Sequence, residues 1–423
     1  MTSPDAVVIS AFGAVTPLGG DYGSIHQALR QGRSGIRAIE KFDCSTFITH
    51  HAGVPEEGNL LLRGFQARKL PAEVLYARLA AERLMARAGH LSRDYAPERL
   101  GCIVGVDVPG AEAHSALEIA SRITGEATRE AFMQQLLRAF RMADFFNLEP
   151  TAVLSEIHQH VRFAGFATTH VGLCSASLQA LGMGLQALRQ QRLDAVIVGG
   201  VSGKVNPLNL ARLEALDVIS TDIRLLPQQR SRPFDQRRSG FVLAEGGVLL
   251  LLEREAAVRR RGALALARVT GYGASLAAEH IVMPHHASLE MTLAMRRALA
   301  DAGRRADEID YVNAHGTSTV LNDRHEAGAI REVFERHQAV PVTANKSLHG
   351  HLMATAGAME VLNTLIALRE GFIPATCNLD AQDANCAVNV VRTTLPCRAA
   401  RVLKNSFGMG GLAASVVLEG MTQ

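Results

Sequence analysis

One cysteine and two histidines stand in short turns where their side chains could act together. Cys174 ends an apolar stretch and opens a run of small residues, while His315 and His351 each lie beside a glycine. A thiol at the start of a helix meets the positive end of the helix dipole and unpaired backbone N–H groups, which favour the thiolate and can hold an oxyanion. One thiol with two imidazoles has the chemistry that carbon–carbon bond formation on thioesters needs.

Each of these residues also has a purely structural explanation. The chain has six cysteines, and a cysteine in a globular protein is most often a buried, inert thiol. It has 16 histidines, most of which must be surface or hydrogen-bonded core residues. His349 and His351 could form a metal pair, but no Cys or carboxylate stands beside them at a suitable spacing, so we expect no metal site.

Two further residues could support the histidines. Lys346 precedes His351 by little more than one helical turn, and Glu360 follows it by about two turns. Each could orient an imidazole or set its charge, and each could equally be a surface residue. The chain uses Arg almost everywhere, so a Lys within a motif is informative. Its only lysines are Lys41, Lys69, Lys204, Lys346 and Lys404.

The composition is that of an ordinary globular protein. The 423 residues are 48% hydrophobic, 20% charged and 5% aromatic, with no Trp, which predicts a large aliphatic core and two or three domains. A net charge of +3 with scattered basic residues argues against nucleic acid but is compatible with an acidic protein partner. The absence of CxxC spacing argues against disulfides and zinc. Short apolar runs and a first segment without a basic region predict a cytoplasmic protein that does not enter a membrane.

Apolar runs of strand length alternate with segments of helical periodicity. The predicted strands are residues 6–12, 100–105, 168–173, 194–198, 247–252, 266–273, 311–314, 340–344, 388–391, 401–405 and 414–418. The predicted helices are residues 68–87, 177–191, 288–302, 323–336 and 354–370. This alternation predicts an α/β protein with layered, buried and largely parallel sheets.

A weak internal echo suggests a duplicated architecture. Cys174-Ser-Ala-Ser leads into a helical segment and then a strand, and His351-Leu-Met-Ala leads into a second helical segment and strand. Two such units, one with the thiol and one with an imidazole, would place the site between two halves. We expect an N-terminal half over residues 1–246, carrying the cysteine, and a C-terminal half over residues 247–423, carrying both histidines.

Seven motifs together carry a family resemblance. They are residues 7–19 with Ser34-Gly-Ile, Leu173-Cys-Ser-Ala-Ser, residues 194–200, Ser231-Arg-Pro-Phe-Asp with Gly240-Phe-Val-Leu-Ala-Glu-Gly, Asn313-Ala-His-Gly-Thr-Ser-Thr with Asp323 and Glu326, Asn345-Lys-Ser with Gly350-His, and Asn405-Ser-Phe-Gly-Met-Gly-Gly. In this order they resemble the β-ketoacyl-[acyl-carrier-protein] synthases, most closely the elongating type II group of fatty acid and type II polyketide synthesis. The resemblance is collinear from residue 7 to residue 419.

The resemblance implies a thiolase fold, in which two similar α-β-α-β-α halves with mixed five-stranded sheets form a molecule that is usually dimeric. Cys174 would take an acyl group from acyl carrier protein (ACP) as a thioester. His315 and His351 would bind the thioester carbonyl of malonyl-ACP, assist loss of CO2 and stabilise the enolate that attacks the acyl group. Neutral imidazoles suit this task better than imidazolium. The product would be a 3-oxoacyl-ACP.

Other residues receive supporting roles from the resemblance. Lys346 and Glu360 match the family's supporting Lys and Glu. The backbone N–H groups of Cys174 and Met409 fall at the oxyanion hole. The phosphopantetheine arm supplied by ACP would be the only prosthetic group involved, with no metal or other cofactor.

The resemblance also assigns residues that bind substrate or ACP. Thr317 and Thr319 match threonines that bind the phosphopantetheine arm, and Phe407 matches the family's Phe beside the nucleophile. Arg68 and Lys69 match a basic pair that docks acidic ACP, although exposed charges of this kind are also common on solvated faces.

Departures from the family pattern concern the acyl pocket. Leu173 and His349 replace smaller residues, and Met409 occupies the position of an aromatic gate. Val108 falls near the residue that limits the acyl pocket. The stretch 112–166, which in the family lines the acyl tunnel and contributes to the dimer interface, is longer than usual.

An intact catalytic set inside an altered pocket indicates a pathway-specific ketosynthase that elongates a polyene or other polyketide. Retention of the cysteine separates the chain from chain-length-factor subunits, which lack it. We expect acyl-ACP and malonyl-ACP as partners, and either a homodimer or a heterodimer with a chain-length-factor subunit. The alternatives are a housekeeping fatty acid elongation synthase and a non-catalytic scaffold subunit.

Overall fold

Eleven strands form one mixed sheet in the computed structural model, which describes residues 6–56, 71–107, 120, 123, 128–139 and 149–421. The order across the sheet is β12-β10-β9-β14-β15-β8-β1-β7-β6-β4-β5. Their bounds are β1 (Val7–Val15), β4 (Leu100–Val106), β5 (Ala167–Val171), β6 (Ala195–Ser202), β7 (Gly246–Arg254), β8 (Ala267–Leu276), β9 (Tyr311–Asn313), β10 (Pro341–Thr343), β12 (Asn389–Val390), β14 (Arg401–Gly408) and β15 (Leu412–Gly420). Each corresponds to one of the eleven predicted strands.

Two small ribbons were not predicted. They pair β2 (Ile36–Ala38) with β3 (His51–Gly53) and β11 (Phe372–Ile373) with β13 (Leu395–Pro396). None of these four short strands lies in one of the apolar runs that predicted the strands of the large sheet.

The large sheet consists of two sets of strands joined by a short seam. One set is β5-β4-β6-β7-β1, and the other is β8-β15-β14-β9-β10 with the short β12 at its edge. Between the sets, β1 and β8 pair at only two positions, Val8 with Arg268 and Ile9 with Ala267. β7 belongs to the first set because it pairs with β1 and β6. The division of the chain into halves after residue 246 stays a prediction.

The prediction of largely parallel sheets is wrong. Parallel pairing is confined to the two outer parts, β5-β4-β6 and β12-β10-β9-β14. The middle of the sheet, from β14 through β15, β8, β1 and β7 to β6, is antiparallel. Strands buried on both faces read as continuous apolar runs whatever their direction, so the sequence pattern did not reveal the antiparallel centre.

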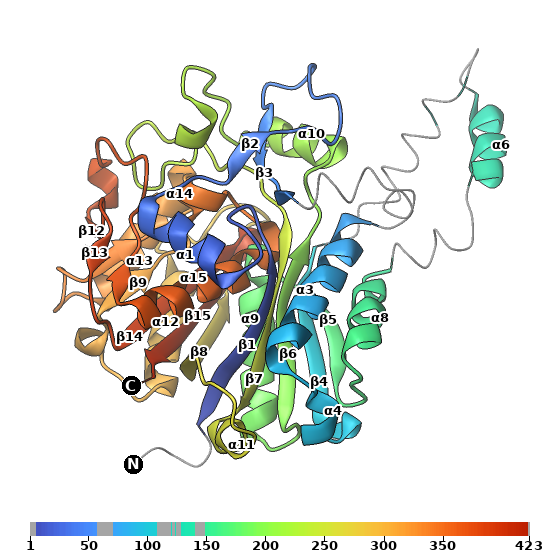
Figure 1. Ribbon diagram of the computed structural model, residues 1–423. Coiled ribbons are helices and arrows are strands. Elements are labelled where there is room, and N and C mark those ends of the chain that lie inside the picture. The colour runs from blue at the N-terminus through green and yellow to red at the C-terminus, as the bar shows by residue number, and fades with distance from the viewer. Residues whose placement is uncertain are drawn as a thin grey trace.

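Helices form three layers around the two sets of strands (Figure 1). The middle layer is α9 (Ala176–Arg189) and α15 (Ala356–Glu370), which contact each other and strands of both sets. On the outer faces lie α3 (Ala72–Ala88) with α8 (Thr151–His160), and α12 (Leu289–Asp301) with α13 (Val320–Val333). The remaining helices are α1 (Tyr22–Gln31), α4 (Leu91–Asp94), α6 (Arg129–Ala139), α10 (Pro207–Ala215), α11 (Glu255–Arg260) and α14 (Lys346–His349). No helix in the described ranges combines the length and apolarity needed to cross a bilayer.

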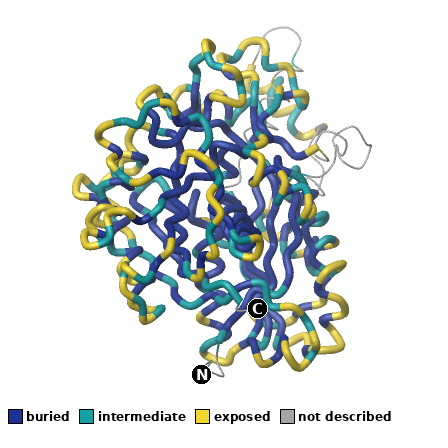
Figure 2. The backbone as a smooth tube through the Cα atoms, turned by 60° about the vertical axis from the view of Figure 1, so that its left-hand side comes forward, coloured by how far each residue is buried: buried dark blue, intermediate teal, exposed yellow. Residues whose placement is uncertain are grey.

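The two middle helices are buried almost all round, as the dark centre of Figure 2 shows. Leu181 and Leu185 of α9 join Val361 and Leu365 of α15 in one apolar core. A helix covered on most sides is expected to be mostly apolar, and both segments are, apart from a few polar residues such as the buried Glu360 of α15. Their N-terminal ends, where the chain enters from the preceding turns, hold the residues of the candidate site.

Candidate active site

Cys174 stands on a sharp turn between β5 and α9. Leu173 has a left-handed backbone with φ 49°, and residues Leu173–Ser175 form a single 3-10 turn before the helix begins. The Ser175 hydroxyl donates to the carbonyl of Gly172 at 2.8 Å, and Ser406 of β14 donates to the carbonyl of Cys174 at 2.9 Å. The turn is therefore held from its own strand and from the other half of the sheet. Cys174 is 5% exposed.

His315 follows β9, and its backbone is held by a buried carboxylate. Glu326 on α13 accepts the N–H groups of His315 at 2.7 Å and Gly316 at 2.8 Å. Gly316 has φ 43° and lies against Ala344, where an added Cβ would meet the Ala344 side chain at 2.4 Å. Glycine is therefore required at this turn for both its conformation and its size.

His351 precedes the second of two similar turns. Gly350 before it has φ 75°, and the His351 N–H donates to the carbonyl of Val242 at 2.7 Å. The backbone N–H of Met353 donates to Nδ1 of the His351 ring at 3.2 Å. In the neutral ring the proton therefore resides on Nε2.

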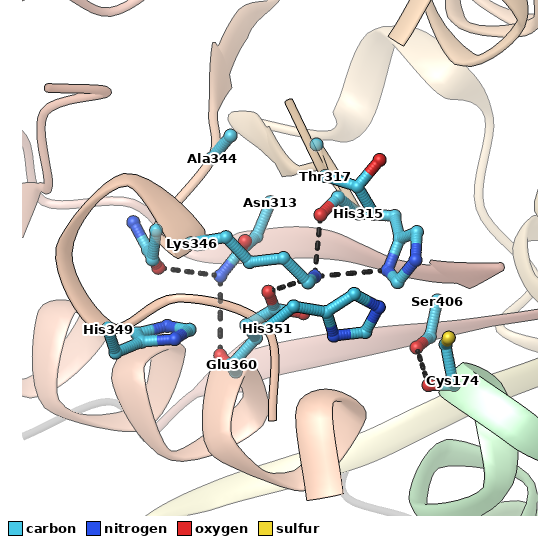
Figure 3. Close-up of polar contacts among 12 residues, drawn as sticks. Cys174, Asn313, His315, Thr317, Ala344, Lys346, His349, His351, Glu360 and Ser406 are labelled. Atoms are coloured by element: carbon cyan, nitrogen blue, oxygen red, sulfur yellow. Dashed lines mark hydrogen bonds and ion pairs between the residues drawn. The ribbon is translucent and has the colours of Figure 1, made fainter. Parts of the chain in front are cut away.

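The three predicted side chains meet (Figure 3). One side-chain sulfur or nitrogen atom from each of Cys174, His315 and His351 lies within 4.8 Å of the other two. The two imidazole rings are 5.3 Å apart between centroids and nearly perpendicular, at 83°. Phe407 lies 6.0 Å from the His315 ring, and Phe241 lies 5.0 Å from the His351 ring. The thiol and both imidazoles therefore lie together, with a phenylalanine ring beside each imidazole.

A buried ion network lies behind His315. The ammonium of Lys346 lies 3.1 Å from Nδ1 of His315, donates to the His315 carbonyl at 2.6 Å and contacts Glu360. An ammonium group can only donate, so Nδ1 of His315 is the acceptor and Nε2 carries the proton. Both imidazoles therefore offer an Nε2–H donor. Glu360 also contacts Lys404, 2.8 Å from its second oxygen.

Burial sets the protonation of the site. It lowers the pKa of His315 and of His351 well below the usual value, and the charge of Lys346 lowers both further, so both rings are neutral near pH 7. Burial also raises the pKa of the Cys174 thiol to about 12, and Lys346 opposes this shift. The resting cysteine is therefore a neutral thiol near pH 7.

Comparison with known proteins places this site in a family. The protein-family models described as the N-terminal and C-terminal domains of β-ketoacyl synthase match residues 4–257 and 266–380. The 3-oxoacyl-[acyl-carrier-protein] synthase 2 of Coxiella burnetii is 30% identical, covering 97% of this chain and 98% of that protein. The tetracenomycin polyketide synthase ketoacyl synthase alpha subunit of Streptomyces glaucescens is 31% identical, covering 97% and 96%. The chain belongs to the β-ketoacyl synthase family.

Solved structures agree with this assignment. The structure titled the ishigamide ketosynthase/chain length factor superposes with a TM-score of 0.86 at 27% identity, covering 99% of both chains. The predicted thiolase fold is confirmed, and the protein is an acyltransferase of the ketosynthase class. Its activity is the condensation that makes 3-oxoacyl thioesters.

The residues predicted to bind substrate lie at several places in the synthase. Thr317 and Thr319 share a hydrogen bond of 2.9 Å between their hydroxyl groups, just before α13. Leu173 lies against Gly408, next to Met409, so the two turns predicted to form the oxyanion hole are in contact. Val108, Arg68 and Lys69 lie outside the described residues.

The His349 ring is enclosed by protein groups. It is fully buried on the far side of Lys346 from Cys174 (Figure 3). Nδ1 donates to the carbonyl of Gly350 at 2.8 Å, and Nε2 lies 3.2 Å from the amide nitrogen of Asn363. These contacts support the turn before His351, and the predicted contact of His349 with substrate stays a prediction.

The tautomers in the synthase argue against metal binding. Nε2 of His315 and Nε2 of His351 carry hydrogens and so offer no lone pair to a metal. Glu279, His285 and His286 form a second group on the surface. There Nδ1 of His285 accepts from the backbone of Ala287, and Nε2 faces Glu279 at 3.1 Å as a donor. His285 and Glu279 thus form a close surface contact. The expectation of no metal site stays a prediction.

Sequence reasoning missed Lys404 and underused Glu326. Lys404 is fully buried and forms an ion pair with Glu360, although nothing in its immediate sequence suggested a role. A signal was present, because the chain has only five lysines and Lys404 directly precedes the Asn405 motif.

Proposed function

We propose that Cys174, His315 and His351 carry out a decarboxylative Claisen condensation of an acyl group with malonyl-ACP, in a specialised polyketide or polyene pathway. The observation that carries the proposal is the meeting of the thiol with two neutral imidazoles that both present Nε2–H. Lys346 and Glu360 support this set from behind.

In the first half-reaction the Cys174 sulfur attacks the thioester carbonyl carbon of acyl-ACP. A carbon–sulfur bond forms to Cys174, the bond to the phosphopantetheine sulfur breaks, and the Cys174 proton passes to the departing thiol. The backbone N–H groups of Cys174 and Met409 would hold the oxyanion, because the Leu173 and Gly408 turns lie in contact. Since burial raises the pKa of Cys174 to about 12, the proton must be lost as the bond forms.

In the second half-reaction malonyl-ACP occupies the space beside the acylated cysteine. Nε2–H groups of His315 and His351 donate to the malonyl thioester oxygen and stabilise the enolate that forms as CO2 departs. The enolate carbon attacks the acyl carbonyl, the new carbon–carbon bond forms, and the bond to sulfur breaks. Cys174 leaves as thiolate and takes up one proton. Neutral imidazoles donate without the cost of burying an additional charge.

Several observations support a specialised pathway and ACP partners. The 31% identical relative is named as an alpha subunit of a polyketide synthase, and the ishigamide structure is titled a ketosynthase/chain length factor. We therefore infer a dimer, with a chain-length-factor partner as the leading arrangement. The partner ACP would carry the only prosthetic group, phosphopantetheine, and would dock near Arg68 and Lys69. The proposed location is the cytoplasm.

Intact-protein mass spectrometry after mixing with a panel of acyl-ACPs tests this function. We expect the wild type to gain one acyl mass and Cys174→Ala to gain none, with polyenoyl or oxoacyl chains preferred over saturated ones. Cys377→Ala is a matched control, because this thiol lies outside the site and its loss should leave acylation unchanged. Acylation of Cys174→Ala would overturn the assignment of the nucleophile. Preference for saturated long chains would overturn the pathway.

A further inference from the structure

Lys404 is a buried cation next to the catalytic network. It lies on β14, is fully buried, and its ammonium is 2.8 Å from one oxygen of Glu360 on α15. Glu360 is its one ion-pair partner among the described residues. Burying an ammonium costs free energy, so a fully buried lysine with a single anionic partner suggests a function.

Glu360 joins Lys404 to His315. One oxygen of Glu360 contacts Lys404 and the other contacts Lys346, whose ammonium lies 3.1 Å from the His315 ring. Burial alone would raise the pKa of Glu360, but the two ammonium groups lower it, so the carboxylate is ionised. The chain Lys404, Glu360, Lys346, His315 is thus a continuous line of charged contacts that ends on a catalytic ring.

The same strand also holds the backbone of His315. Consecutive residues of a strand face opposite sides of a sheet, so Lys404 and Asn405 point in opposite directions. Lys404 reaches Glu360 on one side, and the Asn405 amide reaches Glu326 at 3.3 Å on the other. Glu326 in turn binds the backbone N–H of His315. One strand therefore supports both carboxylates that fix this histidine.

We propose that Lys404 is a positioning residue for the decarboxylation step, acting through Glu360 and Lys346 to keep the His315 ring neutral and its Nε2–H directed at the malonyl thioester. This inference rests on the proposed function and adds a residue to it. The titratable and charged groups that face His315 are Cys174, Glu326, Lys346, His351, Glu360 and Lys404. Removing one cation from this group favours protonation of the ring, which loses its role as a neutral donor.

The test is the pH dependence of malonyl-ACP decarboxylation in the full-length protein with Lys404→Gln. Glutamine removes the charge and retains a donor for Glu360. We expect the acid limb of the profile to move to higher pH by about one unit, which is about a tenfold loss of rate below the limb. Acylation of Cys174 at pH 8 should stay within about twofold of wild type. Lys404→Arg, which keeps the charge, should retain the wild-type profile.

A matched control is Lys41→Gln. Lys41 forms a largely buried ion pair with Glu245, outside the line of contacts from Lys404 to His315, and its loss should not move the acid limb. An unchanged profile in folded Lys404→Gln, or an equal shift in Lys41→Gln, would overturn the proposal. Lys404→Met is the second neutral variant, and failure of both neutral variants to fold would assign Lys404 to stability alone. Failure of wild-type Cys174 to acylate would instead count against the proposed function.

Discussion

The two turns that open α9 and α15 have almost the same backbone and different chemistry. Leu173 (φ 49°) and Met353 (φ 47°) are both left-handed, and each starts a 3-10 turn that leads into a middle-layer helix. The next residue is Cys174 in one turn and Ala354 in the other. A left-handed residue with a side chain is costly, so its presence at both turns indicates a demand of the architecture.

The difference lies in what each turn does for the site. The first presents a thiol beside the imidazoles. The second positions a ring, because the Met353 N–H fixes the tautomer of His351. Ala354 is fully buried, and its N–H donates to Asp107 at 3.3 Å. A sharp turn at a helix start therefore does not make a nucleophile unless its side chain is also reachable and faces hydrogen-bond donors.

The strongest test of this difference moves the cysteine from the first turn to the second. The double variant Cys174→Ala/Ala354→Cys should lose condensation by about a thousandfold or more, because the thiol at 354 is enclosed and lacks the Nε2–H groups. Intact mass after incubation with acyl-ACP should show no acyl group on the double variant. Acylation at position 354 would mean that backbone geometry alone defines the nucleophile.

Two glycines test whether both turns are equally tightly packed. A Cβ on Gly105 would lie 2.5 Å from the backbone nitrogen of Ser177, and one on Gly200 would lie 2.7 Å from the carbonyl oxygen of Ala354. Each change to alanine should lower the free energy of unfolding by about 1–3 kcal/mol in urea denaturation. Gly328→Ala on α13 is the control, because its added Cβ meets nothing within 4 Å. A neutral effect at only one of the two glycines would show that its turn can relax.

Lowering the pH should destabilise the second turn and its surroundings more than the first turn. Burial lowers the pKa of His349 to about 4, and His315 and His351 are also shifted down, so the unfolded chain binds more protons below pH 6.5 and stability falls as pH falls. His349 alone should contribute a loss of about 2 kcal/mol between pH 7 and pH 5. Asp107, with a pKa raised to about 6 by burial, acts in the opposite direction. Urea titrations of wild type and His349→Asn isolate the contribution, and equal slopes with pH would contradict it.

One hydroxyl joins the two helices and gives the smallest expected effect. Ser177 of α9 accepts the backbone N–H of Ala358 at 3.0 Å, in the first turn of α15. Ser177→Ala should cost about 1 kcal/mol, because one buried N–H loses its partner. Thermal unfolding measures this cost, and acylation of Cys174 should be unchanged. A larger loss of acylation than of stability would show that the helices communicate with the thiol.

Much of the fold was readable from the sequence. Every predicted strand has a counterpart in the large sheet, because each of the eleven strands lies in an apolar run that is visible in the sequence. Five helices were also correctly placed, although α13 begins at Val320, three residues before its predicted start, because Thr319 caps it. Strand direction was missed because it leaves no distinct periodicity, whereas α1 was missed although its buried residues Ile25, Ala28 and Leu29 stand at helical spacing.

The sequence predicted site residues where a reactive side chain stands beside a turn or a glycine. Cys174, His315 and His351 were found because each stands beside a turn, and their meeting in space supports the prediction. The ion pair of Lys404 could not be foreseen, because it joins residues on separate elements that only the folded sheet brings together. The burial of His349 and its contact with Asn363 could not be foreseen either, because sequence shows proximity along the chain but not the side of the turn a ring occupies.

The division of the site between two turns also makes the site depend on complete folding. Cys174 comes from one set of strands, and the imidazoles with their lysines come from the other. A chain in which α9 and α15 have not docked keeps the thiol apart from both imidazoles. The proposed condensation therefore needs both sets of strands to be folded, and a partly folded molecule would not turn over substrate.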